Sequence, residues 1–352
     1  MAEPRIGSCV LARRRQQPPK GKRTNGTLHW LAGRGARPGA PRARRRASAG
    51  RAPGSLDPDM ARTPRDLTGR VVAITGGARG IGRATAQACV RAGMLVAIGD
   101  LDLAAAQRTA DELGSGTIAV ELDVCNRASV RHFLDVTEER LGPLDVLVNN
   151  AGIMHLGSLV DEDEGCARRQ VDINVHGVLH GIKEAVPRMA ARGSGHVVNM
   201  ASTAGRGGFA GAATYSGTKH FVVGASEALR FELRGSPVDV SCILPVVVNT
   251  ELAAGSSNAR FVAKLEPEDV AAAVVRTLRA PRFEVFVPRY MHAMMTFAAI
   301  LPRPAREGLA RALKADQVFQ TRDDGARRDY ELRAARSEPG LRPVPDVPER
   351  DD

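Results

Sequence analysis

A glycine-rich stretch after a short apolar run constrains the fold of this chain more than any other feature. Residues 71–74 are apolar, residues 75–82 read T-G-G-A-R-G-I-G, and residues 83–92 have a helical pattern. A strand, a glycine turn and a helix in this order let the backbone approach a pyrophosphate, whose charge is met by the helix N-terminus. The spacing G-x-x-x-G-x-G is one residue wider than the G-x-G-x-x-G fingerprint. An ordinary tight turn therefore stays open as the alternative.

Strand and helix patterns alternate through the body of the chain. After the first strand and helix we expect strands at 94–99, 117–122, 144–148, 196–200, 238–244 and 284–287, and helices at 103–113, 127–141, 214–233 and 268–278. A chain of 352 residues with this alternation suits a single large α/β domain with appendages.

The positive charge of the chain lies at its N-terminus. Residues 1–65 hold 16 Arg and Lys against 3 Asp and Glu, a net charge of +13, whereas the remaining 287 residues hold 34 against 36, a net charge of −2. This basic leader lacks periodic apolar residues, so we expect it to be disordered. A transit peptide or a nucleic-acid-binding arm would share its charge, but a compact domain begins soon after Met60. We therefore expect Met60 to be the natural start, or 1–59 to be dispensable, and we do not expect nucleic acid as a partner.

The cysteines indicate the redox state of the compartment, and the lengths of the apolar runs indicate whether a helix can span a membrane. Five cysteines are scattered along the chain without a Cys-x-x-Cys pair: Cys9, Cys89, Cys125, Cys166 and Cys242. An odd number at such spacings argues against a disulfide framework or a zinc site and favours a reducing compartment, so we expect a cytoplasmic protein without a metal. No apolar run reaches the roughly 18 residues that a spanning helix needs.

Carboxylates at the ends of the second and third strands bear on the choice of nucleotide. Asp100 lies about 20 residues after the glycines, where a carboxylate can accept hydrogen bonds from ribose hydroxyls. It would also repel a 2′-phosphate, which favours NAD over NADP. Arg79 in the glycine loop is the opposing signal, because a cation there could reach that phosphate, but we give Asp100 more weight. Asp123 and Val124 can meet the adenine, and we expect Asp102 to be a helix N-cap.

Two asparagine motifs follow. The sequence N-N-A-G at 149–152 ends the fourth strand, where small residues leave room for a flat ligand, although its composition alone would also suit a polar turn. An amide in mid-helix usually points to solvent or bends the helix, but Asn174 sits in an apolar stretch, so we expect a structural or water-binding role. His176 and His180 are four residues apart, but no third ligand lies nearby in the sequence, and we do not expect them to bind a metal.

A serine precedes a Tyr-x-x-x-Lys pair by thirteen residues. Tyr215 and Lys219 lie four apart, so on a helix they share one face. An ammonium near a phenol stabilises the phenolate, and bringing the tyrosine pKa from about 10 to near 7 takes roughly 4 kcal/mol. Such a phenol could exchange a proton with an alcohol or carbonyl oxygen held by Ser202. Alone the pair is a weak signal, since Tyr and Lys at this spacing also occur on solvated helices.

Five motifs in order resemble the short-chain dehydrogenase/reductase family. They are T-G-x-x-x-G-I-G, N-N-A-G, the helical Asn174, Ser202 and Y-x-x-x-K at 215–219, and the similarity covers about residues 68–290. The resemblance implies a single Rossmann-type, doubly wound α/β domain with a seven-stranded parallel sheet. It also implies a nicotinamide cofactor, NAD or NADP, and a homodimer or homotetramer.

The resemblance further implies an oxidoreductase that interconverts an alcohol and a carbonyl by hydride transfer. Tyr215 would be the general acid/base, Lys219 would lower its pKa and bind the nicotinamide ribose, Ser202 would orient the substrate oxygen, and Asn174 would anchor a relay water. The residues expected to bind the cofactor are Gly76, Arg79, Gly80, Ile81, Gly82, Asp100, Asp123, Val124, Asn150, Ala151, Gly152, Tyr215, Lys219, Val248 and Thr250. The alternative is a catalytically idle NAD(P)-binding sensor or scaffold, which loss of the Tyr or the Lys would favour. Both are present.

One departure from the family pattern is visible. The family has Pro-Gly after the sixth strand, where this chain has Pro245 and Val246. Valine does not adopt a positive φ without a steric cost. We therefore expect the loop to be reshaped around the nicotinamide or the substrate.

The C-terminal part is expected to set the substrate. We assign 66–290 to the Rossmann domain, 291–322 to an apolar, helical extension and 323–352 to a disordered tail, and we expect 251–263 to be a mobile lid. The segment 291–301 is strongly apolar and flanked by arginines. It can be a core or dimer helix, wall a lipophilic pocket with adaptable methionines, or rest on a membrane surface. The last two favour a sterol, retinoid or fatty-chain alcohol or ketone.

Overall fold

The structure is a computed structural model, and it describes residues 64–114, 116–255, 264–314 and 317–319, together with Gly325, Arg327, Tyr330 and Ala334. The expectations for the basic leader before residue 64, and for most of the segment 251–263 and of the tail, lie outside the described residues.

Seven parallel strands form one sheet in the order β3-β2-β1-β4-β5-β6-β7. Their bounds are β1 Val71–Thr75, β2 Leu95–Asp100, β3 Thr117–Glu121, β4 Leu144–Asn149, β5 Gly195–Met200, β6 Val238–Pro245 and β7 Glu284–Val287. The order reverses beside β1, since the chain runs outward from β1 to β3 and then crosses back to β4. This confirms the predicted doubly wound α/β fold with a seven-stranded parallel sheet.

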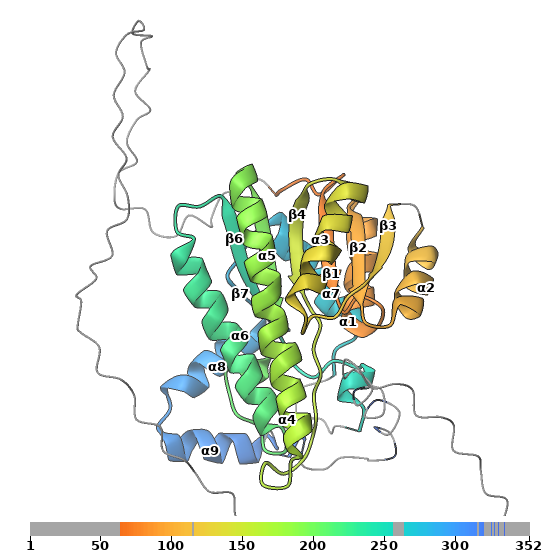
Figure 1. The fold of residues 1–352 in the computed structure, drawn as a ribbon. Helices are drawn as coiled ribbons and strands as arrows, with labels where there is room; N and C mark the ends of the chain where they lie inside the picture. The colour runs from red at the N-terminus through yellow and green to blue at the C-terminus, as the bar shows by residue number, and fades with distance from the viewer. Residues whose placement is uncertain are drawn as a thin grey trace, which may run out of the picture. The chain divides into compact units, whose positions relative to one another are not determined.

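Helices cover both faces of this sheet (Figure 1). The bounds are α1 Gly80–Arg91, α2 Leu103–Leu113, α3 Arg127–Leu141, α4 Glu164–Val171, α5 Gly177–Arg192, α6 Ala213–Glu232, α7 Pro267–Arg279, α8 Tyr290–Ile300 and α9 Arg303–Ala312. One apolar layer joins the sheet to α3, α5 and α6, and the other joins it to α1, α2 and α7. The strands are apolar along their length because a parallel sheet covered on both faces has no solvent side.

Most expected elements agree with the structure to within one to three residues. The helices at 103–113 and 127–141 and the strand at 284–287 have the expected bounds. Asp102 caps α2 by accepting a hydrogen bond from the backbone N–H of Ala105, as predicted. Asn126 caps α3 in the same way through the N–H groups of Ala128 and Ser129. These caps satisfy helix N–H groups that have no partner within the helix.

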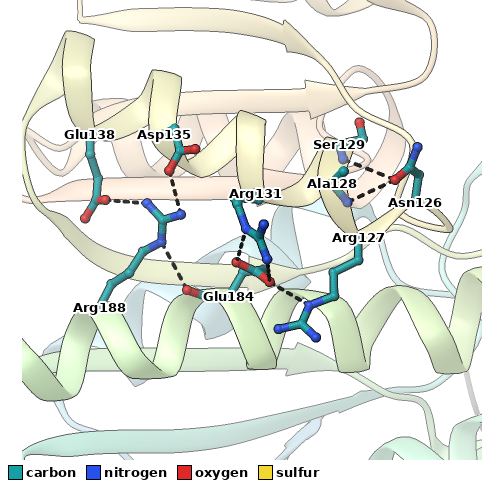
Figure 2. A network of polar contacts seen from close by, with 9 residues as sticks. All are labelled: Asn126, Arg127, Ala128, Ser129, Arg131, Asp135, Glu138, Glu184 and Arg188. Carbon is teal, nitrogen blue, oxygen red and sulfur yellow. Dashed lines mark hydrogen bonds and ion pairs between the residues drawn. The ribbon is translucent and has the colours of Figure 1, made fainter.

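A network of ion pairs fastens α5 to α3 (Figure 2). Glu184 of α5 accepts hydrogen bonds from Arg127 at 2.6 Å and from Arg131 at 3.1 Å, both on α3. Arg188 of α5 donates to two carboxylates of α3. The hydrogen bonds from Arg131 and Arg127 lower the pKa of the Glu184 carboxyl to about 2, although burial opposes the shift. The network therefore holds α5 in a fixed position against α3.

The helices α8 and α9 expose most of their surface. Met291 is the buried residue of α8, and α9 has none. Phe297 and Ile300 of α8 are 55% and 75% exposed. Within the described part of the chain, no helix is both long enough and apolar enough to cross a membrane.

The tail from about residue 323, for which we expect disorder, contains a buried arginine. Arg327 has a helical backbone conformation, and its side chain is 2% exposed. The expectation rested on the high charge of the segment, because charged side chains are rarely buried without partners. Here backbone carbonyls accept the guanidinium hydrogen bonds, so burial of the charge is compensated.

Candidate active site

A cavity of about 750 Å³ opens at the carboxyl ends of the strands. The predicted site residues that line it are Gly76, Arg79, Gly80, Ile81, Gly82, Asp100, Asp123, Val124, Asn150, Ala151, Gly152, Ser202, Tyr215, Lys219, Val248 and Thr250. Every predicted site residue except Asn174 is in this set. The fold brings them together because parallel strands present all their carboxyl ends at one edge, beside the point where the strand order reverses.

The glycine turn between β1 and α1 forms one end of the cavity. Gly76 and Gly80 have φ values of +64° and +51°, which side chains rarely adopt. A Cβ on Gly82 would lie 2.1 Å from the carbonyl oxygen of Gly76. The first turn of α1 has neither a side-chain cap nor an acidic residue. Its N-terminal N–H groups and dipole therefore suit an anion, and the residues present fit a dinucleotide pyrophosphate.

The ends of β1 and β4 are joined by polar contacts beside this turn. The backbone N–H groups of Asn150 and Ala151 both donate to Thr75 Oγ1 at 3.0 Å. The Asn150 side chain donates to the carbonyl oxygens of Thr75 and Gly76 at 3.0 and 2.9 Å. This fixes the N-N-A-G segment against the glycine turn. The asparagine thus shapes the wall of the cavity through backbone contacts.

Three charged groups surround the end of β2. Asp100 accepts hydrogen bonds from the backbone N–H groups of Ala78 and Asp102 at 3.0 and 3.1 Å, and burial raises the pKa of its carboxyl. Arg79 donates to Asp102 Oδ2 at 2.6 Å. Its guanidinium is therefore paired with a carboxylate next to Asp100.

At the end of β3, the Asp123 carboxylate accepts a hydrogen bond from the backbone N–H of Cys125 at 2.9 Å.

Asn174 lies behind the cavity wall in a π-helical turn, Asp172–His176, between α4 and α5. Its side chain is fully buried. The amide oxygen accepts from the N–H of Ile153 at 2.9 Å, while the amide nitrogen donates to the Ile153 carbonyl at 2.8 Å and to Thr218 Oγ1 at 3.1 Å. Turns of this π form often occur at functional sites. Asn174 thereby connects the loop after β4 to α6.

Ser202, Tyr215 and Lys219 all line the cavity. Ser202 follows β5, and its hydroxyl accepts from the N–H of Ala204 at 3.1 Å. Tyr215 and Lys219 share a face of α6 and are 7% and 5% exposed. Lys219 Nζ donates to the carbonyl of Met200 at 2.9 Å and lies 5.6 Å from the centroid of the Tyr215 ring.

The expected lowering of the Tyr215 pKa is not found in the protein alone. Burial raises the pKa of the Tyr215 phenol to about 12, against an opposing hydrogen bond with Ser202. Burial also lowers the pKa of Lys219 to about 8. The physical reason is desolvation, which disfavours the charged form of both groups. The sequence could not reveal it, because i,i+4 spacing does not report how deeply the pair is buried.

The other half of the cavity is apolar and partly formed by residues that sequence reasoning missed. Apolar and aromatic lining residues here are Met154, Phe209, Val247, Leu252, Met291, Met294, Leu313, Val318, Phe319 and Tyr330. Val318, Phe319 and Tyr330 come from the C-terminal segment. The adjacent apolar pair 318–319, within a charged stretch, was the available signal.

The loop after β6 keeps its backbone in an ordinary conformation. Val246 donates its N–H to the carbonyl of Val287 at 3.0 Å and is buried. Among the residues that the structure describes, Lys314 is the one non-glycine residue with a positive φ. Valine at this position therefore creates no left-handed strain, and the loop continues the register of β6 with β7.

The family model for short chain dehydrogenase matches residues 70–260. The chain belongs to this family. A crystal structure of a short chain dehydrogenase/reductase from Burkholderia phymatum in complex with NAD is 29% identical, with a TM-score of 0.61; the match covers 66% of this chain and 93% of that one.

Three curated relatives show how far the likeness extends. Glycine betaine reductase ATRR of Emericella nidulans is 36% identical over 227 residues, which are 61% of this chain and 18% of the relative. Sorbitol dehydrogenase of Cereibacter sphaeroides is 40% identical over 53% of this chain and 73% of its own length. 17-beta-hydroxysteroid dehydrogenase 13 of Mus musculus is 31% identical over 66% and 78%, respectively. The chain thus matches less than a fifth of the fungal reductase and about three quarters of the other two.

Replacement of Gly82 by Ala tests the fit of the glycine turn to a dinucleotide. The added Cβ meets the Gly76 carbonyl and the Asn150 amide, so the turn must shift. We expect NADH affinity, measured by fluorescence titration, to fall by about tenfold or more. Gly224→Ala is the matched control, because a Cβ there meets nothing within 4 Å. Wild-type affinity in the Gly82→Ala variant would contradict the assignment.

Proposed function

We propose that this protein is a nicotinamide-dependent oxidoreductase that interconverts an alcohol and a carbonyl. The observation that carries the proposal is the position of Tyr215 and Lys219. Both are buried on one face of α6 and line the same cavity as the glycine turn. Membership of the short-chain dehydrogenase family and the NAD-bound relative support it. A pair of this kind on a solvated helix would carry no such proposal.

The residues act as follows in this proposal. Tyr215, whose phenol is protonated near neutral pH, donates a proton to the carbonyl oxygen during reduction and accepts it back during oxidation. Lys219 supplies a positive charge that stabilises the phenolate, and Ser202 holds the reacting oxygen. A bound nicotinamide supplies or takes up the hydride. Asn174 is a positioning residue, since its amide is committed to Ile153 and Thr218.

The variant Tyr215→Phe tests the role of the phenol. Removing the hydroxyl removes the proton donor while the ring still fills its place, so kcat is expected to fall by about a thousandfold. NADH affinity is expected to stay within about twofold of wild type, because the ring and the glycine turn remain. Tyr290→Phe is the control, since Tyr290 is exposed on α8.

Two outcomes of this experiment separate the candidate functions. A Tyr215→Phe variant with near wild-type kcat would contradict the role of Tyr215 as proton donor and acceptor. The alternative is a catalytically idle NAD(P)-binding sensor or scaffold of the same fold. That alternative predicts NADH binding by both proteins and no turnover by either.

We propose NAD rather than NADP as the preferred cofactor. Asp100 lines the cavity at the end of β2, where a carboxylate repels a 2′-phosphate. Arg79, the opposing signal, donates to Asp102 at 2.6 Å, and this pairing offsets its charge. The relative solved in complex with NAD is in keeping with this preference.

Asp100→Asn tests this preference, because the amide keeps the size of the side chain and removes its charge. The ratio of kcat/KM for NAD to that for NADP is expected to fall by about tenfold, which corresponds to roughly 1.4 kcal/mol. Asp111→Asn, on the exposed face of α2, serves as the control. An unchanged ratio would mean that Arg79 governs the choice.

We propose that the substrate is lipophilic, such as a sterol, a retinoid or a fatty chain. The support is the apolar lining contributed by Met154, Phe209, Met291 and Met294. Methionine gives such a wall adaptable contacts. One relative is named as a hydroxysteroid dehydrogenase, and another is named for sorbitol, a polar polyol. Turnover of polyols with none of any lipophilic alcohol would remove this part of the proposal.

The exposed part of α8 bears on partners and location. Met291 and Met294 line the cavity, whereas Phe297 and Ile300 are exposed, with Arg303 close by in sequence. We propose that this surface either pairs with a second copy in a homodimer or homotetramer, or rests on a membrane surface. Sedimentation with and without anionic vesicles distinguishes the two. A cytoplasmic location is proposed from the five cysteines, which are odd in number and scattered along the chain without a Cys-x-x-Cys pair.

A further inference from the structure

Arg327 is a buried cation whose hydrogen bonds go to backbone carbonyls of two separate loops. Nη1 donates to the carbonyls of Leu252 and Ala254, both at 3.0 Å, and Nη2 donates to the carbonyl of Met154 at 2.7 Å. The side chain is 2% exposed. A buried guanidinium with three backbone acceptors is costly to assemble and holds its partners in a defined geometry.

These carbonyls belong to loops that leave the sheet from two different strands. Met154 follows the N-N-A-G segment at the end of β4, while Leu252 and Ala254 follow Thr250 beyond the end of β6. In the sheet, β5 lies between β4 and β6, and β5 is the strand that leads into Ser202. Arg327 therefore joins two loops that leave the sheet on either side of β5.

Tyr330 adds a second contact to the same loop. Its hydroxyl accepts a hydrogen bond from the backbone N–H of Met154 at 2.8 Å. The guanidinium carbon of Arg327 lies 5.0 Å from the centroid of the Tyr330 ring. Both backbone polar groups of Met154 are thus bound by the C-terminal segment, and the two side chains that bind them contact each other.

The same C-terminal segment packs against Tyr215. Val318 and Phe319 are 3% and 7% exposed and belong to one apolar cluster with Met154 and Tyr215. The Phe319 ring lies edge-on to Phe209 at 5.7 Å between centroids. Val318 and Phe319 therefore form part of the apolar wall of the cavity.

We propose that Arg327 is a positioning residue that binds the loops after β4 and β6 to each other and so holds them at their spacing beside the wall formed by Val318, Phe319 and Tyr330. The expected effect of Arg327 on catalysis rests on the proposed function. The hydrogen bonds that join the two loops do not depend on it. Arginine suits this position because its planar guanidinium group presents several N–H donors in fixed directions. The ammonium group of lysine is a compact charge and does not.

The first test measures backbone hydrogen exchange, which needs no turnover. Arg327→Met keeps the length of the side chain and removes its donors, so exchange in peptides covering 153–157 and 248–255 is expected to become about tenfold faster, with β1 unchanged. Arg311→Met, on the exposed face of α9, is the control. Unchanged exchange in both peptides, or equally faster exchange throughout the sheet, would overturn the proposal. If Arg327→Met does not fold, Arg327→Lys and Tyr330→Phe carry the same test.

The second test separates positioning from a purely structural role. Primary alcohols of increasing chain length serve as substrates, with NAD as cofactor. Arg327→Met is expected to raise KM for the alcohol by about tenfold while the affinity for NADH stays within about twofold, and Arg327→Lys is expected to restore part of the loss. An unchanged KM, or a loss of NADH affinity as large as the rise in KM, would overturn the proposal. Absence of turnover in the wild-type protein would count against the proposed function and would leave the exchange result to decide on Arg327.

Discussion

Burial of a parallel sheet on both faces is the constraint on which the rest of this structure depends. A parallel pair of strands needs a crossover helix, and those helices cover both faces of the sheet, so polar loops are confined to its edges. The loops that carry the glycine turn, Asp100, the N-N-A-G segment and Ser202 all leave from the carboxyl edge. Residues far apart in sequence therefore meet in one cavity. The apolar strands form the core, and they also confine the polar residues of the site to the loops at their carboxyl ends.

Desolvation sets the charge state of the central pair. Tyr215 and Lys219 are both buried, and burial raises the pKa of the Tyr215 phenol and lowers the pKa of the Lys219 ammonium. The protein alone is therefore poised with a protonated tyrosine beside a lysine that donates to the Met200 carbonyl. A charge or dipole that enters the cavity would act in a poorly solvated environment, where its effect on these two groups is larger than in water.

The fold and most cavity-lining residues could be predicted from the sequence because their signals are local. The glycine turn, the cap at Asp102 and the alternation of strand and helix each depend on residues close together in the chain. The hydrogen bonds of the Asn174 amide could not be predicted, since its partners Ile153 and Thr218 lie 21 and 44 residues away in the chain. Arg327 was missed for a related reason. Its charge suggests solvent, and its three carbonyl partners lie more than 70 residues away.

The central claim is tested most directly by incubating the protein with a panel of alcohols and ketones and each nicotinamide cofactor, and following the absorbance of the reduced cofactor. The panel spans polyols, short alcohols, sterols, retinoids and fatty alcohols with the matching carbonyl compounds. The structure leads us to expect turnover of at least one alcohol–carbonyl pair, greater for lipophilic members and with NAD(H). A protein that binds NADH tightly yet turns over no member of the panel in either direction would contradict the account.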